Sequence, residues 1–151
     1  MKRKIQILLI VGLIANFATP AQESKENWVA VDIENQGSLF INVSGLSNFT
    51  GDDIYVWSLT ETKEPITIDG VDGNIYKTKM YYLINKNLRR YSILQVMYFD
   101  ENDNILKSYS YDHNTDNPDF KYSTPIMKDS DIEKIFLKCL EFIPSVNGNQ
   151  N

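Results

Sequence analysis

The segment Tyr91-Ser-Ile-Leu-Gln-Val-Met-Tyr-Phe99 is followed by Asp100-Glu-Asn-Asp-Asn104 and then by Ile105-Leu-Lys-Ser-Tyr-Ser-Tyr111. Two runs of β-branched and aromatic residues around a short Asp/Asn cluster are typical of a β-hairpin. The two faces of the first run carry Ile93, Met97 and Phe99 on one side and Leu94, Val96 and Tyr98 on the other. A strand that is apolar on both faces belongs in the middle of a sheet. The second run alternates apolar and polar residues, as a strand with one solvated face does.

Four earlier segments have the same strand character. They are residues 28–32, 38–43, 54–59 and 76–84. The connection between the last two, residues 61–74, contains Pro65, Gly70 and Gly73, and we expect it to be irregular. Within it, residues 66–68 could add a short edge strand.

A C-terminal helix is predicted after Pro125. Ser130 and Glu133 have the spacing of a reciprocal capping box, and Pro144 ends the helix. One apolar stripe at helical spacing consists of Ile132, Ile135, Phe136, Cys139, Leu140 and Ile143. The predicted fold class is therefore α+β: an antiparallel sheet of about six strands packed against a C-terminal amphipathic helix.

The N-terminal residues 1–21 are typical of a secretory signal peptide. Lys2, Arg3 and Lys4 precede an apolar run, and small residues stand before a cleavage point after Ala21. The apolar run is shorter than the roughly 20 residues that a membrane span needs. We therefore expect one domain at residues 22–143, followed by a polar tail at 144–151, with no membrane span once the signal is removed.

Removal of residues 1–21 takes away three basic groups and no acidic ones, so the net charge changes from −5 to −8. Such an acidic chain argues against nucleic-acid binding, which depends on basic surface. No cysteine follows the apolar run as a lipidation site, so we expect a periplasmic or secreted protein. The 130 remaining residues are enough for a core that buries about two-thirds of the unfolded surface.

The sequence contains one cysteine and one histidine. Cys139 has no partner for an intramolecular disulfide, and its place in the apolar stripe predicts a small buried hydrophobe. His113 lies among loop Asp and Asn residues, where we expect it to be solvated. Asp100, Asn102 and Asn104 resemble the start of an EF-hand loop, but the required Gly and Glu are missing and a hairpin turn explains them. No catalytic residue, metal site or cofactor is predicted.

One segment concentrates positive charge in this acidic chain. It carries Lys77, Lys79, Lys86, Arg89 and Arg90. Charge on an exposed strand edge blocks unwanted pairing with other chains, which is one interpretation. The other interpretation is a binding site for an anionic partner, such as a sulfated glycan or an acidic protein surface.

Short features along the chain resemble the surface-adhesin protein E-like family of exported bacterial proteins. In order, they are Trp28, the Gly37–Phe40 strand entry, Val56-Trp57, Tyr91-Ser-Ile-Leu, the Tyr98 hairpin, Pro125 before Ser130, and Cys139. The resemblance implies an antiparallel sheet packed on a C-terminal helix and exposed outside the cytoplasm, and a member of the family binds host matrix and plasma proteins. Family members usually carry a second cysteine before the counterpart of Arg89, where this chain has Asn85-Lys86-Asn87.

Three functional hypotheses follow. The leading one is a non-enzymatic exported binding protein, adhesin-like, that recognises a protein or anionic glycan partner. An alternative is a small periplasmic metal-dependent enzyme built on Asp112, His113, Asp116 and Asp119. A structural subunit of an envelope assembly is the third.

Overall fold

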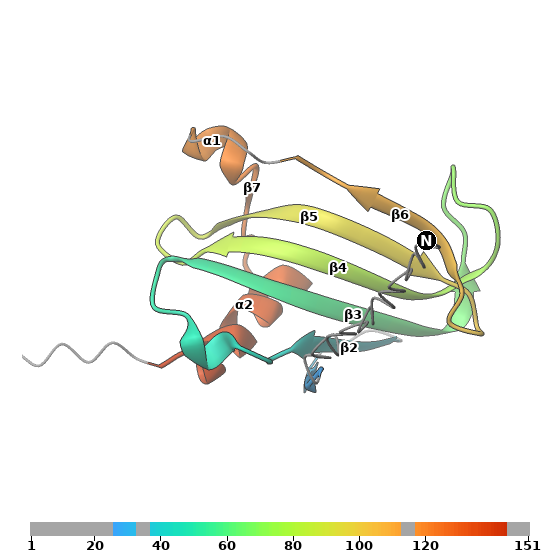
Figure 1. The fold of residues 1–151 in the computed structure, drawn as a ribbon, viewed down its shortest axis with the longest axis horizontal. Helices are drawn as coiled ribbons and strands as arrows, with labels where there is room; N and C mark the ends of the chain where they lie inside the picture. Colours follow the sequence, from blue (N-terminus) through green and yellow to red (C-terminus); the bar gives the residue numbers. More distant parts are fainter. Residues whose placement is uncertain (1–25, 33–36, 113–116, 145–151) are drawn as a thin grey trace, which may run out of the picture.

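The hairpin predicted from residues 91–111 is confirmed, and it lies inside a larger antiparallel sheet (Figure 1). The structure, a computed structural model, describes residues 26–32, 37–112 and 117–144. Its strands are β1 (Trp28–Val31), β2 (Gly37–Asn42), β3 (Asp53–Ile66), β4 (Ile75–Asn85), β5 (Arg90–Phe99), β6 (Ile105–Ser110) and β7 (Thr124–Pro125). Consecutive strands are neighbours from β1 to β6, and β7 pairs with β5. All pairs are antiparallel, so the sheet is a meander with an added short strand.

The remaining elements are short helices and one longer one. They are the 3-10 helix η1 (Leu46–Asn48), α1 (Pro118–Lys121) and α2 (Asp131–Phe142). In the view of Figure 1, α2 lies behind the sheet and covers one of its faces. The predicted arrangement of an antiparallel sheet with a C-terminal helix is therefore confirmed, and most of the molecule is sheet.

The turn between β5 and β6 is held by one side chain. Asp100 Oδ1 accepts hydrogen bonds from the backbone N–H groups of Asn102, at 2.9 Å, and Asn104, at 2.8 Å. Asp103 takes a left-handed conformation with φ 64°, which Asp tolerates better than most residues. These contacts confirm the hairpin-turn interpretation of the Asp/Asn cluster.

The predicted faces of β5 are wrong at one residue. Strict alternation placed Ile93 on the side of Met97, but Ile93 packs against the core that faces α2. The reason is a bulge: Tyr81 pairs with Gln95, whereas the next residue, Tyr82, pairs with Ile93. An extra residue in one strand reverses the alternation beyond it.

The predicted end of the third strand is also wrong. We expected a strand at residues 54–59 and irregular chain after it, but β3 continues to Ile66. β4 is long enough to pair with this extension at Glu61, and pairing resumes at Ile66 after an irregularity. Pro65, which lacks the N–H that a regular ladder needs, falls in this irregular part.

The helix α2 begins and ends close to the predicted residues. Ser130 is the N-cap, and its Oγ accepts from the N–H of Glu133 at 3.3 Å. The return bond differs from the prediction, because Glu133 Oε2 accepts from the N–H of Asp129, at 2.8 Å, and not from that of Ser130. Leu140 is also a correction: it lies at the margin of the apolar arc and is 39% exposed.

The core lies between α2 and the face of the sheet that α2 covers. Its fully buried side chains include Ile41, Leu46, Ile54, Ile84, Ile135 and Cys139. Burial raises the pKa of the Cys139 thiol to about 12. The prediction of a small buried hydrophobe at this position is confirmed.

Several predictions lie outside the described residues. These are the signal peptide at 1–21, His113, and the tail beyond Pro144. Within the part of the chain that the structure describes, no helix has the length and apolar character to cross a membrane.

Candidate functional site

The five predicted basic residues divide between two ends of the sheet. Lys77 and Lys79 lie near the start of β4, whereas Lys86, Arg89 and Arg90 lie in the turn to β5 and at the start of that strand. Lys77 and Lys86 are nine residues apart along extended chain, which corresponds to roughly 30 Å. The structure therefore does not bring the five residues together in one cluster.

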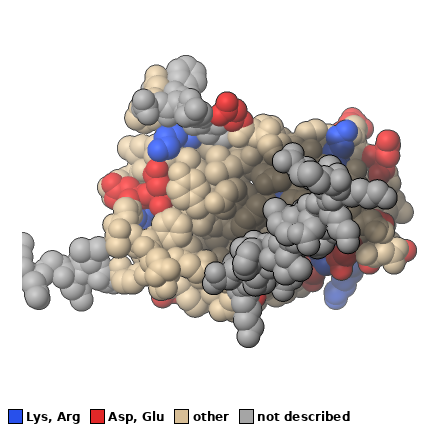
Figure 2. All heavy atoms as spheres, in the orientation of Figure 1, with Lys and Arg blue, Asp and Glu red and all other residues tan. Residues whose placement is uncertain are grey.

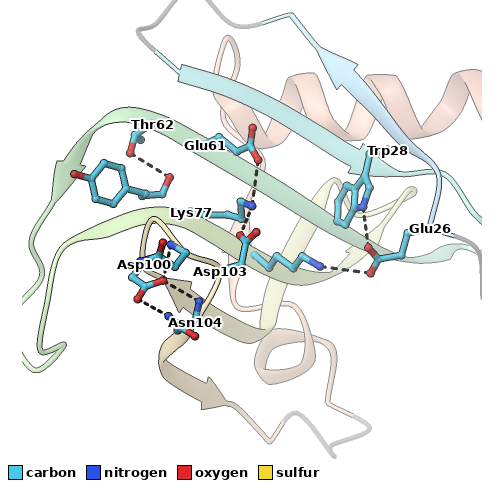
Figure 3. Close-up of polar contacts among 11 residues, drawn as sticks. Glu26, Trp28, Glu61, Thr62, Lys77, Asp100, Asp103 and Asn104 are labelled. Carbon is cyan, nitrogen blue, oxygen red and sulfur yellow. Dashed lines mark hydrogen bonds and ion pairs between the residues drawn. The ribbon is translucent and has the colours of Figure 1, made fainter. Parts of the chain in front are cut away.

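Lys77 lies between two acidic side chains, Glu61 and Asp103 (Figure 3). Lys79 is also paired with an acidic side chain. Lys77 Nζ lies 3.5 Å from Glu61 Oε1 and also donates to Asp103 Oδ1. The hydrogen bond to Asp103 is the main reason that the pKa of Lys77 is raised. Lys79 Nζ lies 3.4 Å from Glu26 Oε1 and 5.2 Å from the centre of the Trp28 ring.

The two arginines are also engaged inside the protein. Arg89 pairs with Glu133 of α2 and lies over the ring of Phe136. Arg90 donates to the backbone carbonyls of Tyr122, at 2.7 Å, and of Ser123, at 3.1 Å. Lys86 has no ion pair among the described residues. Four of the five cations thus have partners within the protein. The strand-edge interpretation is wrong, because β4 and β5 each have a neighbouring strand on both sides. Binding by this segment stays a prediction.

A polar cluster at Asp53 anchors the segment that leads to α2. Its carboxylate accepts from Tyr122 OH at 2.7 Å, from Asn85 Nδ2 at 2.8 Å and from Lys121 Nζ at 3.0 Å. Burial raises the pKa of Asp53, but the hydrogen bonds from these three partners outweigh it and leave the pKa below its usual value. With every partner a donor, this carboxylate serves as a structural acceptor that ties α1 to β3 and β4.

The sheet face opposite α2 carries a row of aromatic side chains. Trp57 and Tyr81 are direct cross-strand partners, and their rings lie 4.8 Å apart at an interplanar angle of 18°. The row continues from Tyr81 to Tyr55, at 6.2 Å, and from Tyr55 to Phe49, at 6.4 Å. Offset contacts of this kind stabilise neighbouring rings.

These rings line an open groove of about 480 Å³, which we call the aromatic groove. Its lining consists of Asn42, Ser44, Gly45, Phe49, Tyr55, Trp57 and Tyr81. None of these residues is charged. Figure 2 looks onto this face: where its atoms are not covered by grey ones, charged side chains are seen toward the two ends and uncharged ones between them.

The turn around η1 fixes the position of Phe49 and Asn42 at the edge of the groove. Gly45 has φ 83°, a conformation that side chains disfavour, and it begins η1. The buried Leu46 fixes η1 to the core, and the N–H of Phe49 donates to its carbonyl at 3.2 Å. Asn42 Oδ1 accepts from the N–H groups of Asn27, at 3.2 Å, and of Ser44, at 3.0 Å.

Tyr81, in the middle of the row of rings, is a neutral group. Burial, and then the neighbouring Tyr55, raise the pKa of Tyr81 above its usual value. The groove therefore offers ring surfaces and neutral hydrogen-bonding groups, and none of its lining side chains is charged. Such a site can bind and orient a ligand.

No protein-family model, curated protein or solved structure matches this chain. The likeness to surface-adhesin proteins thus stays a prediction.

The alternative enzymatic site is not described as a whole. His113 and Asp116 lie outside the described residues. Within residues 26–32, 37–112 and 117–144, no three acidic, histidine or cysteine side chains gather as a metal site would require. The metal-dependent enzyme stays a prediction.

Sequence reasoning missed the aromatic groove. The alternation of residues 54–59 already places Tyr55 and Trp57 on one face. Their meeting with Tyr81, however, depends on the pairing register of β3 with β4, which no local pattern specifies.

Proposed function

We propose that this protein is an exported, non-enzymatic binding protein whose recognition surface is the aromatic groove. The observation that carries the proposal is the row of four aromatic rings on the sheet face opposite α2, where three of them lie along an open groove with Phe49 at its rim. Large apolar patches on soluble proteins mark interaction sites. Aromatic side chains that bury a large area at little entropic cost are the usual anchors of such sites.

The charges of the chain support this choice of surface. Lys77, Lys79 and the two arginines already have partners within the protein. Binding an anionic ligand there would require breaking those contacts. The aromatic groove needs no such rearrangement.

Export and an adhesin-like role belong to the same proposal. They rest on the signal-peptide pattern of residues 1–21 and on the resemblance to the surface-adhesin protein E-like family. A sheet that one helix backs and stiffens, with its other face open, suits recognition outside the cytoplasm.

The test compares two sets of variants of the mature chain, residues 22–151. A Trp57→Ala/Tyr81→Ala double variant removes the groove, and a Lys86→Gln/Arg89→Gln/Arg90→Gln variant neutralises the basic turn. Retention is measured on immobilised heparin, matrix proteins and neutral polysaccharides. We expect the groove variant to lose retention and the charge variant to keep it.

A matched control is the Tyr98→Ala/Tyr109→Ala variant. These rings form an edge-to-face pair, 6.3 Å apart, on the α2 side of the sheet. The control should bind like wild type. Retention that depends on the basic turn and survives loss of the groove, or no retention of any probe by the wild type, would contradict the proposal.

A further inference from the structure

We infer that the aromatic groove binds an uncharged oligosaccharide whose chain lies across the strands. The inference rests on the proposed function and names its ligand class. Three features support it. They are the row of residues that the strand register aligns, the hydrogen-bonding groups in that row, and the absence of charged residues from the lining of the groove.

A row of side chains crosses this face of the sheet from strand to strand. Trp28 pairs with Asn42, Tyr81 pairs with both Trp57 and Gln95, and Gln95 pairs with Ser110. Asn42 and Trp57 line the same groove and so join the two parts of the row. Six strands at spacings of about 4.8 Å make a track about 24 Å long.

This row contains both kinds of group that a sugar ring needs: aromatic surface for its C–H face and hydrogen-bonding groups for its hydroxyl edge. A pyranose presents a C–H face that packs on aromatic rings, and hydroxyl groups around its edge that need donors and acceptors. Trp57 and Tyr81 offer the ring surface, and Asn42 and Gln95 offer side-chain amides beside it. An entirely apolar ligand would leave those amides without partners on binding, which is unfavourable.

The amides are already oriented. Asn42 Oδ1 accepts two backbone hydrogen bonds, so its Nδ2 group points away from them, and within the described part of the chain Nδ2 has no acceptor. Gln95 Nε2 donates to Ser108 Oγ at 3.3 Å, which leaves its carbonyl oxygen as an acceptor. Among the described residues, Trp57 Nε1 also lacks an acceptor. A hydroxyl-bearing ligand would satisfy all three groups.

Electrostatics favour an uncharged sugar. No charged residue lines the groove, and Lys79, two residues before Tyr81 in β4, is paired with Glu26. The predicted mature chain carries a net charge of −8 from the composition. Sulfated and other anionic chains would be repelled at low ionic strength.

Affinity electrophoresis of the mature protein tests the inference. Native gels contain a soluble β-glucan, a xylan or a galactomannan, and a parallel gel contains heparin. We expect retardation in at least one neutral polysaccharide and none in heparin. Trp57→Ala should abolish the retardation, and Tyr98→Ala/Tyr109→Ala should leave it unchanged.

Asn42→Asp is the sharpest variant. It keeps the oxygen that holds Asn27 and Ser44 but replaces the amide donor, so the fold is maintained while one ligand hydrogen bond is lost. Affinity should fall about two- to tenfold, as expected for a hydrogen bond of ordinary strength. A melting curve equal to that of the wild type separates this loss from unfolding.

The outcomes distinguish the ligand class from the site. Groove-dependent retention on a protein probe, with no retardation in any neutral polysaccharide, would overturn the sugar and leave the proposed function standing. A dimer that Trp57→Ala converts to a monomer would assign the groove to a second copy of the chain and overturn the inference. Absence of binding to every probe would overturn both.

Discussion

On the face that α2 covers, Ile54 and Ile84 are fully buried, whereas Tyr55, the next residue along β3, is 38% exposed on the opposite face. Both faces are apolar in this part of the sheet, yet α2 packs on only one of them. The covered face accounts for stability in the usual way, by removing aliphatic surface from water. The open face keeps aromatic surface accessible, which is what a binding site requires. The two faces should therefore respond differently to the same chemical change.

The largest difference is expected in thiol reactivity. Cys139 is fully buried behind the sheet, and burial raises its pKa from 9.0 to about 12, so its thiolate fraction near neutral pH is roughly a thousandfold smaller than usual. A Tyr55→Cys substitution in a Cys139→Ser background places the thiol on the open face. Labelling with a disulfide reagent at pH 8 should be at least about a hundredfold faster at position 55. Comparable rates would show that α2 does not cover its face.

The next largest difference between the two faces is expected in the stability lost when an aromatic ring is removed. Phe136→Ala removes a buried ring from α2 and should lower the free energy of unfolding by about 3–5 kcal/mol. Tyr55→Ala removes a ring that is already partly hydrated and should cost about 1 kcal/mol. Urea denaturation measures both values. Equal losses would mean that the open face is a second core.

The elements that the sequence predicted correctly are those set by residues close together in the chain. The hairpin around Asp100 and the helix after Ser130 each depend on residues close in sequence. Two other features depend on partners far along the chain: the extension of β3 beyond residue 59 on β4, and the Asp53 cluster on Tyr122, 69 residues away. The reversed face of Ile93 comes from a bulge, which alternation alone cannot locate.

A further effect, smaller than that of Phe136→Ala, is expected at Asp53, which binds the α1 segment to the sheet. Its folded-state pKa is below the ordinary value of 3.8, so the stability it contributes is present above pH 3.8 and is lost as pH falls through the folded pKa. Asp53→Asn should lower stability at pH 7 by about 2 kcal/mol, as for other hydrogen bonds to a charged group. The difference from wild type should shrink below about pH 4. Asp52→Asn, at an exposed neighbour, is the control and should change little at either pH.

The central claim is that ligand binds against Trp57 on the open face. The chain has two tryptophans, so Trp28→Phe leaves Trp57 as the only one. Titration of this variant with oligosaccharides from the retarding polysaccharide should change the Trp57 emission in a saturable way, and Asn42→Asp should shift the midpoint to higher concentration. An emission spectrum that stays constant while the polysaccharide still retards the protein would place binding elsewhere and contradict the account.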